Sequence, residues 1–98
     1  MGSILDERDY RLAQLCDAMS NGVRLKLILL LRDDERYVKS LAEELNRHST
    51  TISKQLSRLA HQDLVQSETR GRKNYYSLKK PKLIKEFLKL RPLLRREE

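Results

Sequence analysis

The chain has 98 residues, enough for one small domain, and a formal net charge of +7 at pH 7. Its longest apolar run, from Leu27 to Leu31, is far shorter than the roughly 18–20 residues of a membrane-spanning helix. The single Cys16 excludes an internal disulfide framework and a cysteine-rich zinc finger. The acidic segment Asp6–Asp9 argues against a secretory signal peptide. We therefore expect a cytoplasmic domain with no membrane partner.

The positive charge is concentrated in the second half of the chain. Between Arg47 and Arg91 there are twelve basic and three acidic residues, a net charge of +9, which leaves −2 for the remainder. Such an asymmetry favours a polyanionic partner, with nucleic acid ahead of an anionic membrane surface. The alternative is a lysine-rich face that is only solvated, and the charge alone does not decide between them.

Two helices are predicted in the first third of the chain. Apolar residues recur on one side of the segment 5–19, which is typical of an amphipathic helix. Asn21 is a good N-cap for a second helix that runs to about Arg32. The apolar residues from Val23 to Leu31 cover nearly its whole circumference, so this helix is expected in the centre of the core.

A pair of helices joined by a tight turn is predicted next. Ser40 and Glu43 have the spacing of a capping box, which would start a short helix at Leu41. This helix has room for about two turns before it ends near Leu45, and residues 46–48 then make the turn.

The second helix of the pair is expected over residues 49–61, with Ser49 or Thr50 as its N-cap. Its buried stripe is predicted to consist of Ile52, Leu56, Leu59 and Ala60. The opposite face is polar and carries Lys54 but no Asp or Glu. An ordinary solvated helix face mixes charges of both signs, so the absence of acids favours an anionic partner.

A β-hairpin is predicted over residues 64–78, where the hydrophobic period changes from 3.6 to 2. Its turn, Arg70–Asn74, contains Gly71 and three cations. Tyr75 and Tyr76 alternate across the second strand, so one is expected to pack on the core while the other points outward.

A last helix is expected over residues 80–91, with Pro81 in its first turn and Pro92 at its end. A short strand is also expected around Tyr37 and Val38. No repeat or linker divides residues 1–98, so the chain is predicted to be one mainly α domain with a small β-hairpin. The order of four helices, a hairpin and a fifth helix is that of a winged helix-turn-helix.

The residues that fill this order resemble the ArsR/SmtB family of dimeric bacterial and archaeal transcription repressors. Asn21–Leu31 is similar to the family pattern D-P-x-R-L-x-I-L-x-L-L, and Ser40–Leu45 and Thr50–Leu59 continue the match. Leu64–Val65 and Gly71–Leu78 are similar to the start and return of the family's wing. The resemblance extends over about two-thirds of the chain in one collinear register.

The chain departs from the family pattern in two ways. Asp63 stands where the family usually has Gly, although Asp tolerates a left-handed backbone better than most residues. The thiolate pair of the arsenic- and cadmium-sensing members falls at Tyr37 and Lys39, and residues 79–98 contain no His. A metal site needs about four suitable ligands. We therefore expect neither of the family's metal sites, and no cofactor.

The resemblance implies a DNA-binding role for the predicted recognition helix, residues 49–61. Thr50, Ser53 and Lys54 lie at base-contacting positions of its N-terminal half. Gln55 lies at a family contact position too, where Gln can pair in bidentate fashion with adenine, but its angle is nearer the buried stripe. Phosphate contacts are expected from Arg47, Ser49, Ser57 and Arg58. Minor-groove or phosphate contacts are expected from Arg70, Arg72 and Lys73 at the tip of the wing.

A homodimer is predicted through the first and last helices, about 5–19 and 80–91. Their apolar residues exceed what one small domain can cover, and the resemblance implies the same interface. The predicted interface residues are Leu5, Leu12, Leu15, Cys16, Met19, Leu83, Ile84, Phe87, Leu88 and Leu90. Cys16 is expected to be a small buried hydrophobe, and a disulfide between the two Cys16 residues of a dimer is the alternative.

The predicted function is that of a sequence-specific regulator of transcription, a dimeric repressor on a pseudo-palindromic double-stranded DNA operator. It would act on the nucleoid, in the cytoplasm of a bacterium or archaeon. An enzyme is not expected, because no catalytic set is suggested by the residue spacing and no glycine-rich phosphate loop is present. The alternative is a winged-helix module that binds DNA non-specifically in a chromatin or architectural role, or that binds a protein or RNA.

Overall fold

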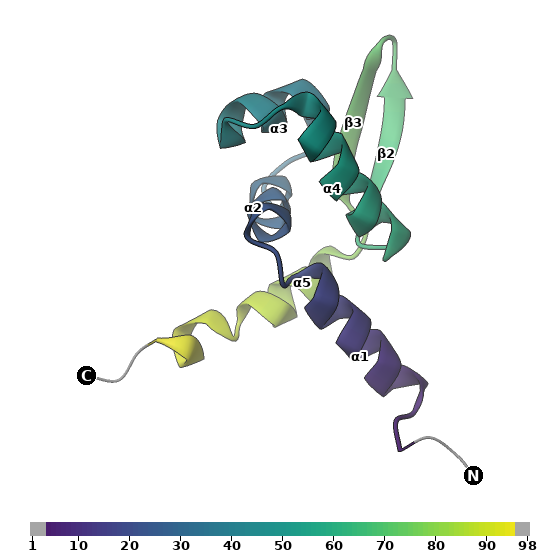
Figure 1. The fold of residues 1–98 in the computed structure, drawn as a ribbon, viewed down its shortest axis with the longest axis vertical. Coiled ribbons are helices and arrows are strands. Elements are labelled where there is room, and N and C mark those ends of the chain that lie inside the picture. Colours follow the sequence, from purple (N-terminus) through teal and green to yellow (C-terminus); the bar gives the residue numbers. More distant parts are fainter. Residues whose placement is uncertain (1–3, 96–98) are drawn as a thin grey trace.

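The computed structural model describes residues 4–95, so the two ends of the predicted domain, 1–3 and 96–98, lie outside the described part (Figure 1). The elements follow the predicted order and confirm a mainly α fold with a β-hairpin wing. They are α1 (Glu7–Ala18), α2 (Gly22–Leu31), β1 (Arg36–Tyr37), α3 (Val38–Leu45), α4 (Ser49–His61), β2 (Val65–Arg70), β3 (Lys73–Leu78), α5 (Pro81–Leu88) and the 3-10 helix η1 (Arg91–Leu94). Within residues 4–95 no helix is both long and apolar enough to cross a membrane.

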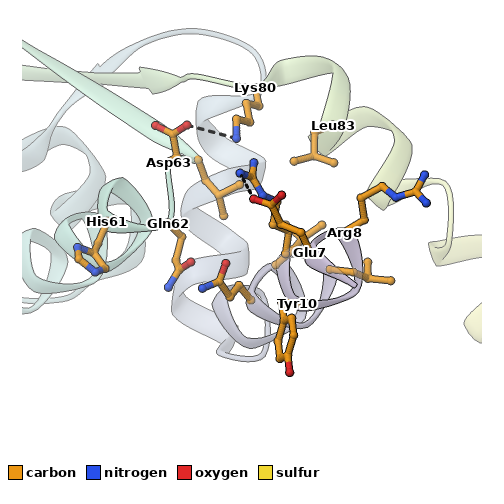
Figure 2. Close-up of a pocket in the computed structure, with 13 residues that line it drawn as sticks. Glu7, Arg8, Tyr10, His61, Gln62, Asp63, Lys80 and Leu83 are labelled. Carbon is orange, nitrogen blue, oxygen red and sulfur yellow. Dashed lines mark hydrogen bonds and ion pairs between the residues drawn. The ribbon is translucent and has the colours of Figure 1, made fainter. Parts of the chain in front are cut away.

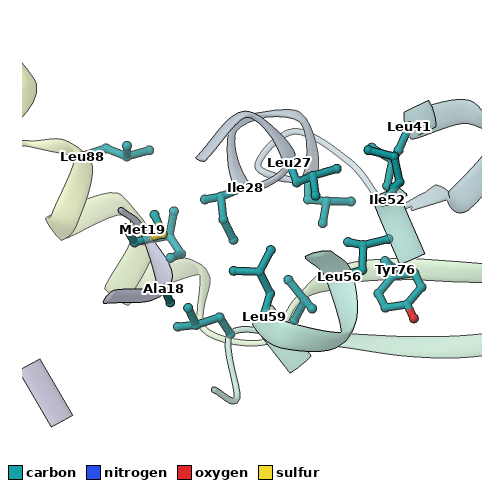
Figure 3. Packing of buried hydrophobic residues seen from close by; sticks show 14 of the residues in the cluster. Ala18, Met19, Leu27, Ile28, Leu41, Ile52, Leu56, Leu59, Tyr76 and Leu88 are labelled. Carbon is teal, nitrogen blue, oxygen red and sulfur yellow. The ribbon is translucent and has the colours of Figure 1, made fainter. Parts of the chain in front are cut away.

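The core is built around α2, as its apolar circumference predicts. Leu27 and Ile28 of α2 are completely buried and face α4, whose side chains Leu56 and Leu59 lie across from them (Figure 3). Ala60 was predicted to extend the buried stripe of α4, but it is exposed. The stripe is therefore narrower than predicted and consists of Ile52, Leu56 and Leu59.

The wing belongs to a three-stranded antiparallel sheet in the order β1-β3-β2. Arg70 pairs with Lys73, so only Gly71 and Arg72 form the turn, in place of the predicted turn of five residues. Gly71 has a φ of +63°, a left-handed conformation that glycine adopts without strain. The hairpin projects as an arm beside α4 (Figure 1).

The two tyrosines of β3 alternate as predicted. Tyr76 is buried in the core cluster, whereas Tyr75 is half-buried on the other face of the strand. The Tyr75 ring lies against that of Tyr37 in β1, with 5.9 Å between ring centroids. The central strand therefore connects the hydrophobic core to an aromatic pair on the outer side of the wing.

The first helix of the helix-turn-helix begins earlier than predicted, at Val38. Its N-cap is Tyr37, and no side chain caps it. The predicted capping box of Ser40 and Glu43 is not formed, because Ser40 Oγ lies inside the first turn and accepts a hydrogen bond from Nη2 of Arg36 at 2.8 Å. The reason is the pairing of β1 with β3, which extends the backbone up to Tyr37 and leaves the chain to enter the helix directly afterwards.

The turn between α3 and α4 depends on a left-handed asparagine. Asn46 has φ 52° and ψ 50°, and this C-cap ends α3 just after Leu45. α4 then begins at Ser49, but its N-cap is His48 and no side chain caps it, so the predicted caps Ser49 and Thr50 are both wrong.

The terminal helices also differ in detail from their prediction. α1 begins at Glu7, and Asp6 is its N-cap. The side chains of Asp6 and Asp9 each accept a hydrogen bond from the backbone N–H of the other residue, at 3.0 Å. α5 ends at Leu88, earlier than predicted. Pro92 does not end α5, because it lies in η1. In Figure 1 α1 and the C-terminal segment leave the body of the molecule in different directions.

Candidate nucleic-acid interface

The outer face of α4 is a continuous polar and basic surface. The helix is held by its buried stripe, so the residues on the opposite side point into solvent. No acidic residue lies in α4, and within residues 4–95 none of the cations of this face forms an ion pair. We call this surface the α4 outer face; its exposed side chains are Arg47, Ser49, Thr50, Ser53, Lys54, Ser57 and Arg58.

The spacing of these residues places several of them on one side of α4. Ser53 and Lys54 follow Thr50 by three and four residues, and Ser57 follows them by four and three, so the four residues share one side of the helix. The first turn of α4 has no side-chain cap, which leaves its backbone N–H groups and the positive end of the helix dipole available to an anion. The start of α4 therefore combines hydroxyls, a lysine and free N–H groups.

The three cations predicted to contact DNA from the wing, Arg70, Arg72 and Lys73, have different surroundings. Arg72 is exposed in the two-residue turn and forms no ion pair within the described part of the chain. Lys73 lies over the Tyr37 ring, with its Nζ 4.7 Å from the ring centroid. Arg70 folds back onto the protein, where it stacks on Tyr75 and pairs with Glu35. Of the three, Arg72 is exposed and contacts neither an acid nor an aromatic ring within residues 4–95.

The base of the wing is fixed by Asp63, which has a φ of +64°. This left-handed conformation is the one expected at a position where the family has Gly. The Asp63 carboxylate pairs with Lys79 at 2.5 Å and Lys80 at 3.3 Å. Hydrogen bonds from these two lysines lower the pKa of Asp63. Asp63 thus joins the start of β2 to the end of β3, and two cations of the basic half are already paired.

A buried arginine that the sequence analysis did not single out contacts the recognition helix. Arg24 of α2 is only 9% exposed. Its Nε donates to Ala18 O at 2.7 Å and its Nη2 to Asp17 O at 3.2 Å, which satisfies backbone carbonyls at the C-terminal end of α1. Its Nη1 donates to Gln55 Oε1 at 3.0 Å. The available signal was an arginine among the apolar residues of α2, because a buried charge requires partners.

Gln55 therefore differs from the other predicted DNA contacts. It is half-buried, at the margin of the α4 outer face, as its helical angle suggested. Its side-chain oxygen is already bound to Arg24, whereas the side chains of the outer face make no such contact with the core.

The predicted dimer interface separates into buried and exposed residues. Ile84 has no accessible surface within this chain, and Met19 and Leu88 keep only 7% and 6%, so these three side chains offer little to a second subunit. The interface itself stays a prediction. Cys16 is exposed in the described chain, contrary to the prediction that it is buried. The remaining predicted interface residues keep accessible surface; Leu15 and Phe87 are half-buried, and Leu5, Leu12, Leu83 and Leu90 are exposed.

A groove of about 750 Å³ lies between α1, the C-terminal end of α4 and the start of α5. Figure 2 shows Tyr10 of α1 and Leu83 of α5 lining it, and the Asp63–Lys80 pair at its far wall. Leu12 and Leu15 also line it. The groove lies at the opposite end of α4 from Ser49, so it belongs to the surface of the terminal helices and not to the α4 outer face.

Comparison with known proteins places the helix-turn-helix in a family. The family model described as "Bacterial regulatory protein, arsR family" matches residues 21–67. The HTH-type transcriptional regulator Rv0324 of Mycobacterium tuberculosis (strain ATCC 25618 / H37Rv) is 32% identical over 68 residues. The aligned part is 69% of this chain but only 30% of that relative's length.

Solved structures share the complete fold. The transcriptional repressor BigR from Xylella fastidiosa superposes with a TM-score of 0.80 at 24% identity, over 93% of each chain. The homodimeric winged helix-turn-helix DNA-binding domain of Mb0332 from Mycobacterium bovis superposes with a TM-score of 0.72 at 22% identity, over 99% of each chain. The matched family is described as bacterial regulatory proteins, and the matched relative as a transcriptional regulator. Residues 21–67 are therefore a helix-turn-helix of the arsR family of bacterial regulators, set within a winged helix-turn-helix fold.

Proposed function

We propose that this protein is a sequence-specific regulator of transcription that binds double-stranded DNA as a dimeric repressor. The observation that carries the proposal is the α4 outer face, which presents exposed hydroxyl and basic side chains without a single acid. Its cations are unpaired within the described residues, so they are available to a polyanion. The likeness to a homodimeric DNA-binding domain and to a repressor supports the same function.

Within this proposal the residues have separate tasks. Thr50, Ser53 and Lys54 on the N-terminal half of α4 contact base edges in the major groove. The phosphate backbone is held by the side chains around them, which fix the register but carry no sequence information. These are Arg47, Ser49, Ser57 and Arg58, with Arg72 from the wing.

A dimer would place two such helices on one duplex. The exposed leucines of α1 and α5, among them Leu12 at 59% and Leu83 at 38%, form an apolar surface away from the α4 outer face. Two helices related by a twofold axis suit a pseudo-palindromic operator with half-sites about 34 Å apart, one turn of B-DNA. The positions of the familiar metal ligands carry Tyr37 and Lys39, so we propose that repression does not respond to metals through those sites.

The test is selection of bound sequences from a pool of random duplexes, followed by titration of the selected duplex at several salt concentrations. We expect one enriched, pseudo-palindromic motif and a steep fall of affinity with salt. Lys54→Ala should relax the motif, at ~1–3 kcal/mol for the lost base contact, whereas Arg72→Ala should weaken all sequences evenly. Lys26→Ala, an exposed lysine of α2, is the matched control.

The alternatives predict other results. A non-specific architectural protein would bind duplex DNA with salt dependence but select no motif. A protein- or RNA-binding module would show no duplex affinity that Lys54→Ala reduces. Either result would exclude the specific regulator.

A further inference from the structure

The contact between Arg24 and Gln55 determines which face the Gln55 amide can present. Gln55 is on the recognition helix, at the margin of the α4 outer face, and its Oε1 accepts a hydrogen bond from Arg24 Nη1 at 3.0 Å. Arg24 is itself fixed by the carbonyls of Asp17 and Ala18 at the end of α1. A guanidinium held by three hydrogen bonds in a site with 9% exposure has little freedom to move.

The chemistry of the two groups sets the orientation of the amide. A guanidinium only donates, whereas an amide has an accepting oxygen and a donating NH2 group. If the Gln55 amide were turned over, its NH2 group would face the donors of Arg24 and the buried guanidinium would lose an acceptor. The oxygen of Gln55 is therefore held toward the core, and Nε2, on the other side of the planar amide, is the polar atom left for a partner.

We propose that Arg24 is a positioning residue that makes Gln55 a hydrogen-bond donor toward DNA. This inference rests on the proposed function and revises the role that the sequence suggested for Gln55. A bidentate pair with adenine needs both a donor and an acceptor from the amide. Because the Gln55 oxygen is directed to Arg24, Gln55 instead donates from Nε2 to an acceptor on DNA, which is N7 of a purine, O6 of guanine, O4 of thymine or a phosphate oxygen.

The two sources of that acceptor predict different results for Gln55→Ala. If the acceptor is on a base, the preference at one base pair of the selected motif is lost and affinity for the best duplex falls about fivefold, as expected for one hydrogen bond. If the acceptor is a phosphate, the same fall occurs evenly on all sequences, and a single methylphosphonate linkage in the DNA abolishes the difference between Gln55→Ala and the unaltered protein.

A second variant tests the positioning by Arg24. Arg24→Lys keeps a cation but cannot donate to Gln55 and to the end of α1 in the same geometry. We expect it to reproduce the effect of Gln55→Ala at the same base pair or phosphate, with the effect of Lys54→Ala unchanged. A residue that only stabilised the fold would instead weaken every position of the motif equally.

The DNA itself provides a test that needs no protein variant. We expect binding to weaken when the acceptor at the Gln55 position is removed, by a 7-deazapurine for N7, 2-aminopurine for guanine O6, a thymine analogue without O4, or a methylphosphonate for a phosphate oxygen. Removal of the adenine N6 amino group at that position should have no effect. Dependence on that amino group would overturn the inference, because it requires an acceptor from Gln55.

The remaining outcomes separate this inference from the proposed function. If the unaltered protein selects a motif but Gln55→Ala keeps the same motif and affinity, the donor role of Gln55 is wrong and the proposed function stands. If the unaltered protein binds no duplex DNA, both are overturned.

Discussion

The carboxylate of Glu35, in the loop between α2 and β1, lies 2.5 Å from Nη2 of Arg70 in the wing. The same guanidinium lies over the Tyr75 ring, with 4.1 Å from Cζ to the ring centroid. The hydrogen bond to Glu35 raises the pKa of Arg70. An acid of the protein thus binds a cation that the sequence assigns to DNA, and it does so where a phosphate oxygen would bind.

We predict that Glu35→Gln increases the affinity for duplex DNA. Without the Glu35 carboxylate, Arg70 keeps only its longer contact with Glu68, at 3.6 Å. A phosphate then competes for Arg70 more easily, so the slope of log affinity against log salt should become steeper by up to about 0.9. The measurement is a set of DNA titrations over a range of salt concentrations. Arg70→Ala in the Glu35→Gln background should remove the gain, and an unchanged slope in Glu35→Gln would show that Arg70 does not reach the DNA.

The turn of the helix-turn-helix gives a prediction about stability. Asn46→Ala should lower the free energy of unfolding by about 1 kcal/mol, because a β-carbon is disfavoured in the left-handed conformation of this C-cap. Asn46→Gly is the control and should be at least as stable as Ala, since glycine adopts this conformation freely. Urea denaturation measures both. Equal stability of the two variants would mean that the turn relaxes out of the left-handed region.

A substitution at Leu12 of α1 tests the proposed homodimer. Leu12→Glu places a charge on the exposed apolar surface of α1 and should shift the protein from dimer to monomer at micromolar concentration. Light scattering measures the mass, and circular dichroism should show unchanged helix content, since Leu12 takes no part in the core. Gln66→Glu adds the same charge on β2 and should leave the mass unchanged. A monomeric mass for the unaltered protein would contradict the proposed dimer.

Asp63 gives the stability of the wing a pH dependence. Hydrogen bonds from Lys79 and Lys80 hold the pKa of Asp63 below its ordinary value of 3.8. Because the folded-state pKa is the lower one, the two pairs add stability above about pH 4, and this contribution is lost as the pH falls through the lowered pKa. Asp63→Asn should therefore be less stable than the unaltered protein at pH 7, and the difference should shrink below pH 3.8.

Urea midpoints between pH 2 and 7 measure this difference, which high salt should also reduce because the groups are exposed. Asparagine keeps the tolerance for the left-handed backbone, so the comparison isolates the charge. Asp33→Asn, an exposed acid of the α2–β1 loop, is the matched control. A pH-independent difference would mean that the lysine pairs do not carry the effect.

The parts of the fold that depend on local pattern were predictable from the sequence. The apolar circumference of α2 indicates its central place, and alternation along β3 indicates that Tyr75 and Tyr76 lie on opposite faces. The bounds of α4 were predicted from its apolar stripe and from the polar residues Ser49 and Thr50 after the turn, although neither of these residues caps the helix. In each case the feature is determined by residues that are close together in the sequence.

Several of the errors concern contacts between residues far apart in the chain. The early start of α3 follows from the pairing of β1 with β3, whose residues are about 40 positions away. The Arg24–Gln55 hydrogen bond joins residues 31 positions apart. Helical spacing also cannot tell which apolar residues of a terminal helix its own chain covers, which is why Ile84 was assigned to a subunit interface although it is buried in the core.

The separation of the α4 outer face from the core has a consequence for evolution. Thr50, Ser53 and Lys54 are exposed and bind no other side chain within the described residues, so they can be exchanged with little effect on folding. A change at Gln55, in contrast, leaves a buried arginine without its acceptor. With the DNA contacts proposed above, the DNA preference of this protein can change through the first three positions, while the fourth is constrained by the interior of the protein.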